Sequence, residues 1–184
     1  MLQVAREATT KYRAEHAQPL NESAKRNLSI CCFSEIRDSM LMWTHYADQH
    51  RGCCIEFDVR GLFIPGAVGC LLPVIYKDEL FDVTPYYSAI AKGGGNNWSA
   101  MLAACHKTRI WSYEREGRLV FPYYLKEKAH FTIPIKSLTM GLRVESQVQR
   151  RLFEIAQKLK VPLFRTLPSS TESTLLFEPV TNPS

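Results

Sequence analysis

Two short polar clusters in the sequence contain the residue types that could perform chemistry. In one of them Glu114, Glu116 and Arg118 occupy alternate positions. If this run is extended, its period of two puts the three side chains on one face. When two carboxylates lie close together, repulsion between them raises the pKa of one carboxyl group, whereas a guanidinium beside them lowers that pKa. Such a pair could hold a ribose hydroxyl, deprotonate a nucleophile or stabilise a cationic transition state. The alternative is an ion-paired strand face without chemistry.

The other cluster contains His45 and Tyr46 within a helix predicted over 38–50. The His45 ring could bind a ligand, or it could be a partly buried residue whose ring nitrogens are satisfied. The Tyr46 hydroxyl needs a hydrogen-bond partner if it is buried. Between the clusters, Lys107 could pair with a carboxylate or an anionic ligand, or it could be a solvated lysine.

Other chemistries have little support in the sequence. No esterase, zinc-protease or phosphate-loop motif is present. The six cysteines lack the C-x2–4-C spacing of zinc sites, and adjacent cysteines in a strand point to opposite faces. We interpret the cysteines as buried small hydrophobic residues in a reducing compartment. We therefore expect no metal ion and a cytoplasmic location.

Charge and hydropathy argue against two classes of partner. The formal net charge is +5, but lysine and arginine are scattered rather than gathered in one stripe, so a nucleic-acid partner is not expected. The densest basic group surrounds one predicted helix and contains Arg143, Arg150, Arg151, Lys158 and Lys160. No apolar run reaches the length that a membrane helix needs, and the N-terminal residues lack a signal-peptide pattern. A membrane partner is therefore not expected either.

The elements that must position these residues alternate irregularly along the chain. Apolar runs predict strands over 28–34, 53–59, 71–76, 118–125, 130–135, 138–144, 164–167 and 175–180. Helices are predicted over 1–17, 38–50, 85–92 and 98–107, and from Ser146 to Pro162 with Gln149 as a capping-box partner. This order favours an α+β fold with a mixed or antiparallel sheet and several flanking helices. We expect an N-terminal helical segment over 1–27, one compact domain over 28–180, and a frayed tail over 181–184.

The ordered set of motifs resembles a bacterial domain-of-unknown-function family (number two-nine-seven-one) over residues 28–180. The motifs are Cys32–Glu35 (CFSE), Met42–Asp48 (MWTHYAD), Gly52–Phe57 (GCCIEF) and Trp111–Arg118 (WSYEREGR). Family members usually begin with a tyrosine-rich strand and carry an Asn-Asp-Pro-Phe segment, and this sequence shows neither. The resemblance implies that a site which needs that first strand would be incomplete here.

A looser resemblance concerns the tripeptide Glu114-Arg115-Glu116, which is similar to the Glu-x-Glu motif of ADP-ribosyltransferases. That resemblance implies NAD as the cofactor. Glu116 would hold a nicotinamide-ribose hydroxyl and stabilise the oxocarbenium-like transition state, and Glu114 would position or deprotonate the acceptor. His45 and Tyr46 would bind or stack on the dinucleotide. Lys107 and Arg118 would be further cofactor-binding residues.

The sequence leaves open whether the protein is an enzyme. The leading hypothesis is an NAD-dependent ADP-ribosyltransferase-like enzyme, with a dinucleotide as ligand. The alternative is a non-catalytic interaction or sensing domain of a bacterial defence or toxin system, with a protein partner. A third hypothesis is a nuclease or nucleic-acid binder built on Glu114, Glu116 and Lys107, which would need a divalent metal ion and a salt-dependent affinity for polyanions. The enzyme hypothesis predicts that His45, Tyr46, Glu114 and Glu116 converge on one open cleft. The interaction domain predicts that Glu114 and Glu116 are ion-paired on the surface, far from His45.

Overall fold

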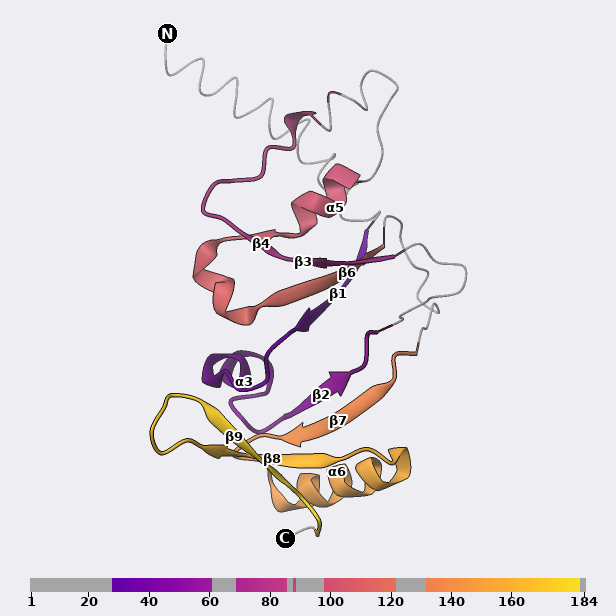
Figure 1. Ribbon diagram of the computed structural model, residues 1–184, viewed down its shortest axis with the longest axis vertical. Helices are drawn as coiled ribbons and strands as arrows, with labels where there is room; N and C mark the ends of the chain where they lie inside the picture. Colours follow the sequence, from indigo (N-terminus) through magenta and orange to yellow (C-terminus); the bar gives the residue numbers. More distant parts are fainter. Residues whose placement is uncertain (1–27, 61–68, 86–87, 89–97, 122–131, 183–184) are drawn as a thin grey trace. The chain divides into compact units, whose positions relative to one another are not determined.

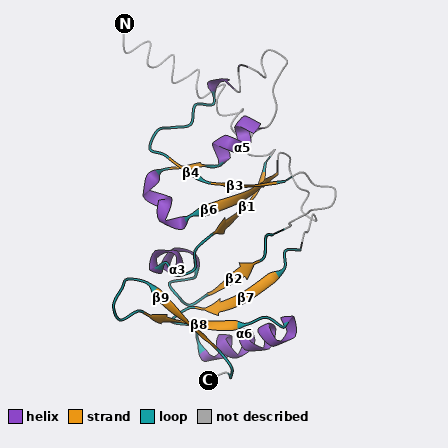
Figure 2. Cartoon of the chain, viewed as in Figure 1, coloured by secondary structure: helices purple, strands orange, loops and turns teal. Residues whose placement is uncertain are grey.

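The computed structural model describes residues 28–60, 69–85, 88, 98–121 and 132–182. Within these ranges helices and mixed or antiparallel sheets form the α+β arrangement predicted from the sequence (Figures 1 and 2). The predicted helical segment over 1–27, and most of the helix predicted over 85–92, lie outside the described residues. None of the helices within the described ranges is long and apolar enough to cross a membrane.

Contacts along the chain divide it into two compact units, each assembled from separate stretches of sequence. Unit 1 contains the described residues of 1–33, 65–112 and 116–129. Unit 2 contains those of 34–64, 113–115 and 130–184. The prediction of one domain over 28–180 stays a prediction.

Unit 1 is built on a three-stranded sheet with strand order β1-β6-β3 and on a parallel pair, β4 and β5. The strands are β1 (Ser29–Ser34), β3 (Cys70–Pro73), β4 (Ile75–Tyr76), β5 (His106–Lys107) and β6 (Glu116–Phe121), and the helix is α5 (Trp98–Ala104). The single strand predicted over 71–76 is interrupted at Val74, whose N–H donates to the Glu116 carbonyl at 2.8 Å. The helix predicted over 98–107 ends at Ala104, because His106 and Lys107 instead pair with β4.

The core of unit 1 joins α5 to β6. Met101, Cys105 and Val120 are buried together, with Cys70 and Leu72 packed against them. Among the six cysteines, which are all free, only Cys105 is buried. The interpretation of the cysteines as buried residues is therefore wrong for most of them. Cys32 is exposed because it lies at an outward position of the alternating strand β1.

Unit 2 is built on a four-stranded mixed sheet with strand order β2-β7-β8-β9. The strands are β2 (Cys53–Phe57), β7 (Ile135–Met140), β8 (Leu163–Pro168) and β9 (Leu175–Pro179), and the helices are α3 (Met40–Tyr46) and α6 (Ser146–Leu159). Strands β7 and β8 are parallel, and α6 provides the crossover that such a pair requires (Figure 1). The two strands predicted over 130–135 and 138–144 are replaced by the single strand β7 within the described residues.

Helix α6 covers one face of this sheet and closes the core. Leu152 and Ala156 are buried against Leu138, Met140 and Leu163. The predicted capping box is wrong, because Glu145 occupies the N-cap position without a side-chain cap and the Gln149 amide donates to the Val144 carbonyl at 2.8 Å. At the other end Lys160 adopts a left-handed conformation, and its N–H reaches back to two helical carbonyls.

Helix α3 is shorter than predicted and ends in a tight turn. Ser39 caps its first turn, but the helix ends at Tyr46 rather than at His50. Asp48, Gln49 and His50 have positive φ angles of 46°, 52° and 69°, so the backbone turns away from the helix axis. The Gly52 N–H then closes the turn on the Ala47 carbonyl at 2.8 Å, and β2 starts at the next residue.

Candidate functional site

The two glutamates of the Glu-x-Glu tripeptide lie in different elements. Glu114 is the last residue of a 3₁₀ helix (Arg109–Glu114), whereas Glu116 is the first residue of β6. Between them Arg115 has a φ of 44°, which is incompatible with an extended run. The prediction that Glu114, Glu116 and Arg118 share one strand face is therefore wrong for Glu114. Only Glu116 and Arg118 keep the spacing of two within one strand.

Glu116 is the centre of a buried ion-pair cluster in unit 1. Its Oε1 accepts from Arg118 Nε at 2.8 Å, and its Oε2 accepts from Arg118 Nη2 at 3.0 Å. The Lys107 ammonium lies 3.3 Å from Oε2, and Cys32, from the neighbouring strand β1, also interacts with the carboxylate. The Glu116 side chain is only 8% exposed, so these interactions are poorly screened by water. We refer to Cys32, Lys107, Glu116 and Arg118 as the Glu116 cluster.

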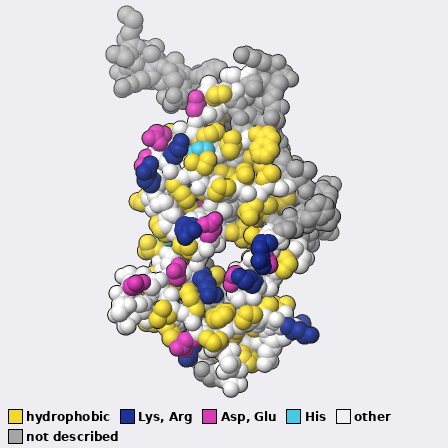
Figure 3. Space-filling model, in the orientation of Figure 1, with side chains coloured by type: hydrophobic (Ala, Val, Ile, Leu, Met, Phe, Trp, Pro, Cys, Tyr) yellow, Lys and Arg dark blue, Asp and Glu magenta, His cyan; other side chains and the backbone are white. Residues whose placement is uncertain are grey.

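The surrounding residues fix the two cations of this cluster. Arg118 Nη1 donates to the Ala104 carbonyl, so all three guanidinium nitrogens are engaged within unit 1. The Lys107 ammonium also lies 5.0 Å from the centre of the Trp111 ring, a cation–π distance. The Glu116 N–H donates to the Tyr76 hydroxyl at 2.8 Å. Backbone and side chain of Glu116 are thus both held in place. Figure 3 shows that other lysine and arginine side chains (dark blue) also lie beside aspartate and glutamate side chains (magenta) on the visible face.

The electrostatics of the cluster keep Glu116 ionised. Burial alone would raise the pKa of its carboxyl group, but hydrogen bonds from Arg118 and Cys32, together with the charges of Arg118 and Lys107, lower that pKa to about 2. Although the Cys32 side chain is exposed, desolvation by the atoms around its thiol raises the pKa of that thiol to about 11, with a further contribution from Glu116. Burial also raises the pKa of Cys31, Cys53, Cys54 and Cys105. None of these five thiols is activated as a nucleophile.

The low pKa of Glu116 predicts a specific loss of stability in acid. Because the pKa is lower in the folded chain than the ordinary value of 4.5, the carboxylate stabilises the fold above pH 4.5. This contribution, on the order of 3 kcal/mol, is lost as the pH falls through the folded pKa. Urea unfolding of wild type and Glu116→Gln should therefore show a large difference near pH 7 that shrinks below about pH 3. A difference that does not change with pH would contradict the assignment.

Unit 2 holds the other predicted residues in a second cluster. The Tyr46 hydroxyl donates to Glu114 Oε1 at 2.8 Å, and Glu114 is only 2% exposed. The Glu114 carbonyl accepts from the Ser34 hydroxyl at 2.7 Å, which fixes the end of the 3₁₀ helix. The His45 ring lies 6.3 Å from the Tyr46 ring and 6.4 Å from the Tyr113 ring. We refer to His45, Tyr46, Tyr113 and Glu114 as the Tyr46 cluster; Tyr46 itself is 64% exposed.

The structure thus divides the predicted site residues between two clusters in different units. Glu116, Lys107 and Arg118 come together in unit 1, and His45, Tyr46 and Glu114 come together in unit 2. Sequence reasoning missed Cys32, Tyr76 and Tyr113 as members or neighbours of these clusters. Tyr113 could have been selected from its place beside Glu114, but nothing local signals Cys32 or Tyr76, which come from other strands.

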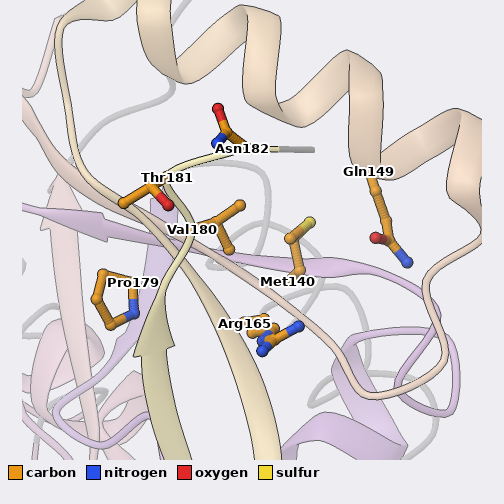
Figure 4. Close-up of a pocket in the computed structure, with 7 residues that line it drawn as sticks. All are labelled: Met140, Gln149, Arg165, Pro179, Val180, Thr181 and Asn182. Atoms are coloured by element: carbon orange, nitrogen blue, oxygen red, sulfur yellow. The ribbon is translucent and has the colours of Figure 1, made fainter. Parts of the chain in front are cut away.

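A small pocket in unit 2 contains none of the predicted site residues. It has a volume of about 120 Å³, and its lining comes from β7, α6, β8 and the end of β9 with the residues after it: Met140, Gln149, Arg165, Pro179, Val180, Thr181 and Asn182 (Figure 4). Its charged group, Arg165, is already paired with Glu178 at 2.8 Å. Across the described ranges, no three histidine, cysteine or acidic side chains gather as metal ligands would. The two clusters remain the candidate sites.

Comparison with known proteins supports the family resemblance. No curated protein and no solved structure matches the chain. A family match covers residues 42–119, and this segment includes every predicted site residue from His45 to Arg118. The matching family is described as "Protein of unknown function (DUF2971)", so the family predicted from the sequence motifs is confirmed over this segment.

Proposed function

We propose that this chain is a non-catalytic interaction or sensing domain in which Glu116 has a structural role. The observation that carries the proposal is the number of donors around its carboxylate. Arg118 donates twice, and Lys107 and Cys32 each add an interaction. An ionised carboxylate offers about four lone-pair sites. The donations from Arg118 and Lys107 already occupy most of these sites, so a ribose hydroxyl would have to compete with these donors or displace one of them.

The energetic cost of such a displacement argues against the transferase role for Glu116. The side chains of Arg118 and Lys107 are only 16% and 21% exposed. If a ligand displaced either cation from the Glu116 carboxylate, that cation would lose part of its charge neutralisation where water solvates it poorly. A carboxylate stabilises a cationic transition state through its negative charge, and it does so best when no other cation already neutralises that charge. The two neighbouring cations leave Glu116 little of that capacity.

The wider role proposed for the chain is that of the sensing or partner-binding part of a bacterial defence or toxin system in the cytoplasm. The six free cysteines fit a reducing compartment. Exposed apolar side chains such as Leu41, Tyr46 and Leu176, each more than half exposed, are suited to contact a protein partner.

An NAD-dependent transferase-like enzyme is the second candidate, and the Tyr46 cluster favours it. There a buried carboxylate, Glu114, orients an exposed tyrosine beside the rings of His45 and Tyr113. Aromatic rings of this kind can stack on a nicotinamide or adenine ring. In this account Glu114 would be the functional glutamate, and Glu116 would still be structural.

Nicotinamide release separates the two candidates. Purified wild type, Glu114→Gln and Tyr46→Phe are incubated with NAD, and nicotinamide is quantified by chromatography. NAD binding is measured by calorimetry. The proposal predicts no binding and no release above the buffer control. Release by wild type that is lost in Glu114→Gln, at an unchanged melting temperature, would overturn it in favour of the transferase.

A further inference from the structure

Helix α6 carries an apolar stripe that the core of unit 2 does not use. Val148, Ile155 and Leu159 are 41%, 39% and 45% exposed, although they lie on the same side of the helix as the buried Leu152. Their positions, together with Leu152, are separated by four, three and four residues. This is the spacing of a seam along which one helix packs on another. We refer to Val148, Ile155 and Leu159 as the α6 stripe.

The charges beside the stripe have one sign. Arg151 and Lys158 are exposed and flank the stripe on its solvent side, since each lies three residues from a stripe residue on the helical surface. Arg150 and Lys160 add positive charge, and Glu154 is the only acidic residue between Ser146 and Lys160. Within the described part of the chain, none of these four basic side chains forms an ion pair.

We propose that the α6 stripe and its basic flank bind an acidic amphipathic helix of a protein partner. The apolar seam would receive the partner's apolar residues, and Arg151 and Lys158 would face its carboxylates. This inference is independent of the role of Glu116, because it rests on α6 alone.

Other occupants fit the same surface less well. A second copy of the chain would bring the same positive charges to the interface, which disfavours self-association. A membrane-bound helix needs the centre of its apolar face free, but Leu152 and Ala156 are committed to the core. A nucleic acid would use the basic side chains and leave the apolar seam without a role.

The test uses a pair of designed peptides as probes. Both are amphipathic helices of roughly 20 residues with leucine along one seam, a length at which an isolated helix can form. One has glutamate beside the seam and the other has lysine. Fluorescence anisotropy with the full chain should show that the acidic peptide binds at least about tenfold more tightly, and that salt weakens its binding.

Matched variants locate the binding on α6. Arg151→Glu, at an exposed position, should weaken binding of the acidic peptide at least about tenfold, and Ile155→Asp should abolish it. Leu80→Asp, at an apolar position of unit 1 that is 93% exposed, should leave binding unchanged. The proposal is overturned if both peptides bind equally or neither binds, or if Arg151→Glu leaves the affinity unchanged. It is also overturned if Ile155→Asp instead abolishes self-association or binding to anionic vesicles.

Discussion

Replacement of Gly141 by alanine is expected to lower the free energy of unfolding by at least about 3 kcal/mol, or to prevent unit 2 from folding. An added Cβ would lie 2.2 Å from the His50 carbonyl oxygen and 2.7 Å from its carbon. These are backbone atoms held by hydrogen bonds: the Arg143 N–H donates to the His50 carbonyl at 2.9 Å, and the Gly141 N–H donates to the Gly52 carbonyl at 3.0 Å. The turn therefore cannot move aside without losing both bonds.

Gly117→Ala is the matched control for this variant. At that position, in β6, an added Cβ would come no closer than 3.8 Å to Leu71 and 3.9 Å to the Leu72 carbonyl. Its effect should stay within about 0.5 kcal/mol. Urea unfolding followed by circular dichroism measures both. Equal stability of the two variants would show that the turn and β7 are not packed as described.

Glu116→Gln is expected to destabilise the chain by about 3 kcal/mol. The variant removes the negative charge that compensates Arg118 and Lys107, and the new amide group can place its own N–H toward one of these donors. Both cations remain mostly buried, so water replaces the lost interaction only in part. Thermal unfolding should therefore show a clear fall in melting temperature.

An exposed ion pair provides the control for Glu116→Gln. Glu35 and Arg115 approach to 3.0 Å, but their side chains are 64% and 61% exposed. Glu35→Gln should therefore change stability by less than about 1 kcal/mol. If Glu116→Gln and Glu35→Gln lower the stability by the same amount, burial does not strengthen the interactions of Glu116, and the structural role proposed for Glu116 is contradicted.

Elements with strong local patterns were predictable from the sequence. The apolar runs placed β1, β2, β8 and β9 close to their observed bounds, and Ser146 and Pro162 framed α6. The turn after α3 was not predictable, because Asp48, Gln49 and His50 are not glycines and their left-handed conformations depend on bonds to other segments. One such bond joins His50 to Arg143, far along the chain.

The candidate sites were predictable only in part, for a similar reason. The condition that the run is extended holds for Glu116 and Arg118, because β6 begins two residues before the strand predicted over 118–125. The left-handed Arg115 separates Glu114 from them. The sequence offered a carboxylate as one partner for Lys107, and this pairing exists. Cys32 reaches Glu116 because β1 lies beside β6 in the sheet, and strand order is not encoded in any local pattern.

A double-mutant cycle between Glu116 and Arg118 tests the central claim most directly. Unfolding free energies are measured for wild type, Glu116→Gln, Arg118→Gln and the double variant. If Glu116 is a structural ion-pair partner, the two substitutions should be coupled by about 2 kcal/mol or more, since each removes the same buried interaction. Additivity within about 0.5 kcal/mol would contradict the claim and leave Glu116 available for another role.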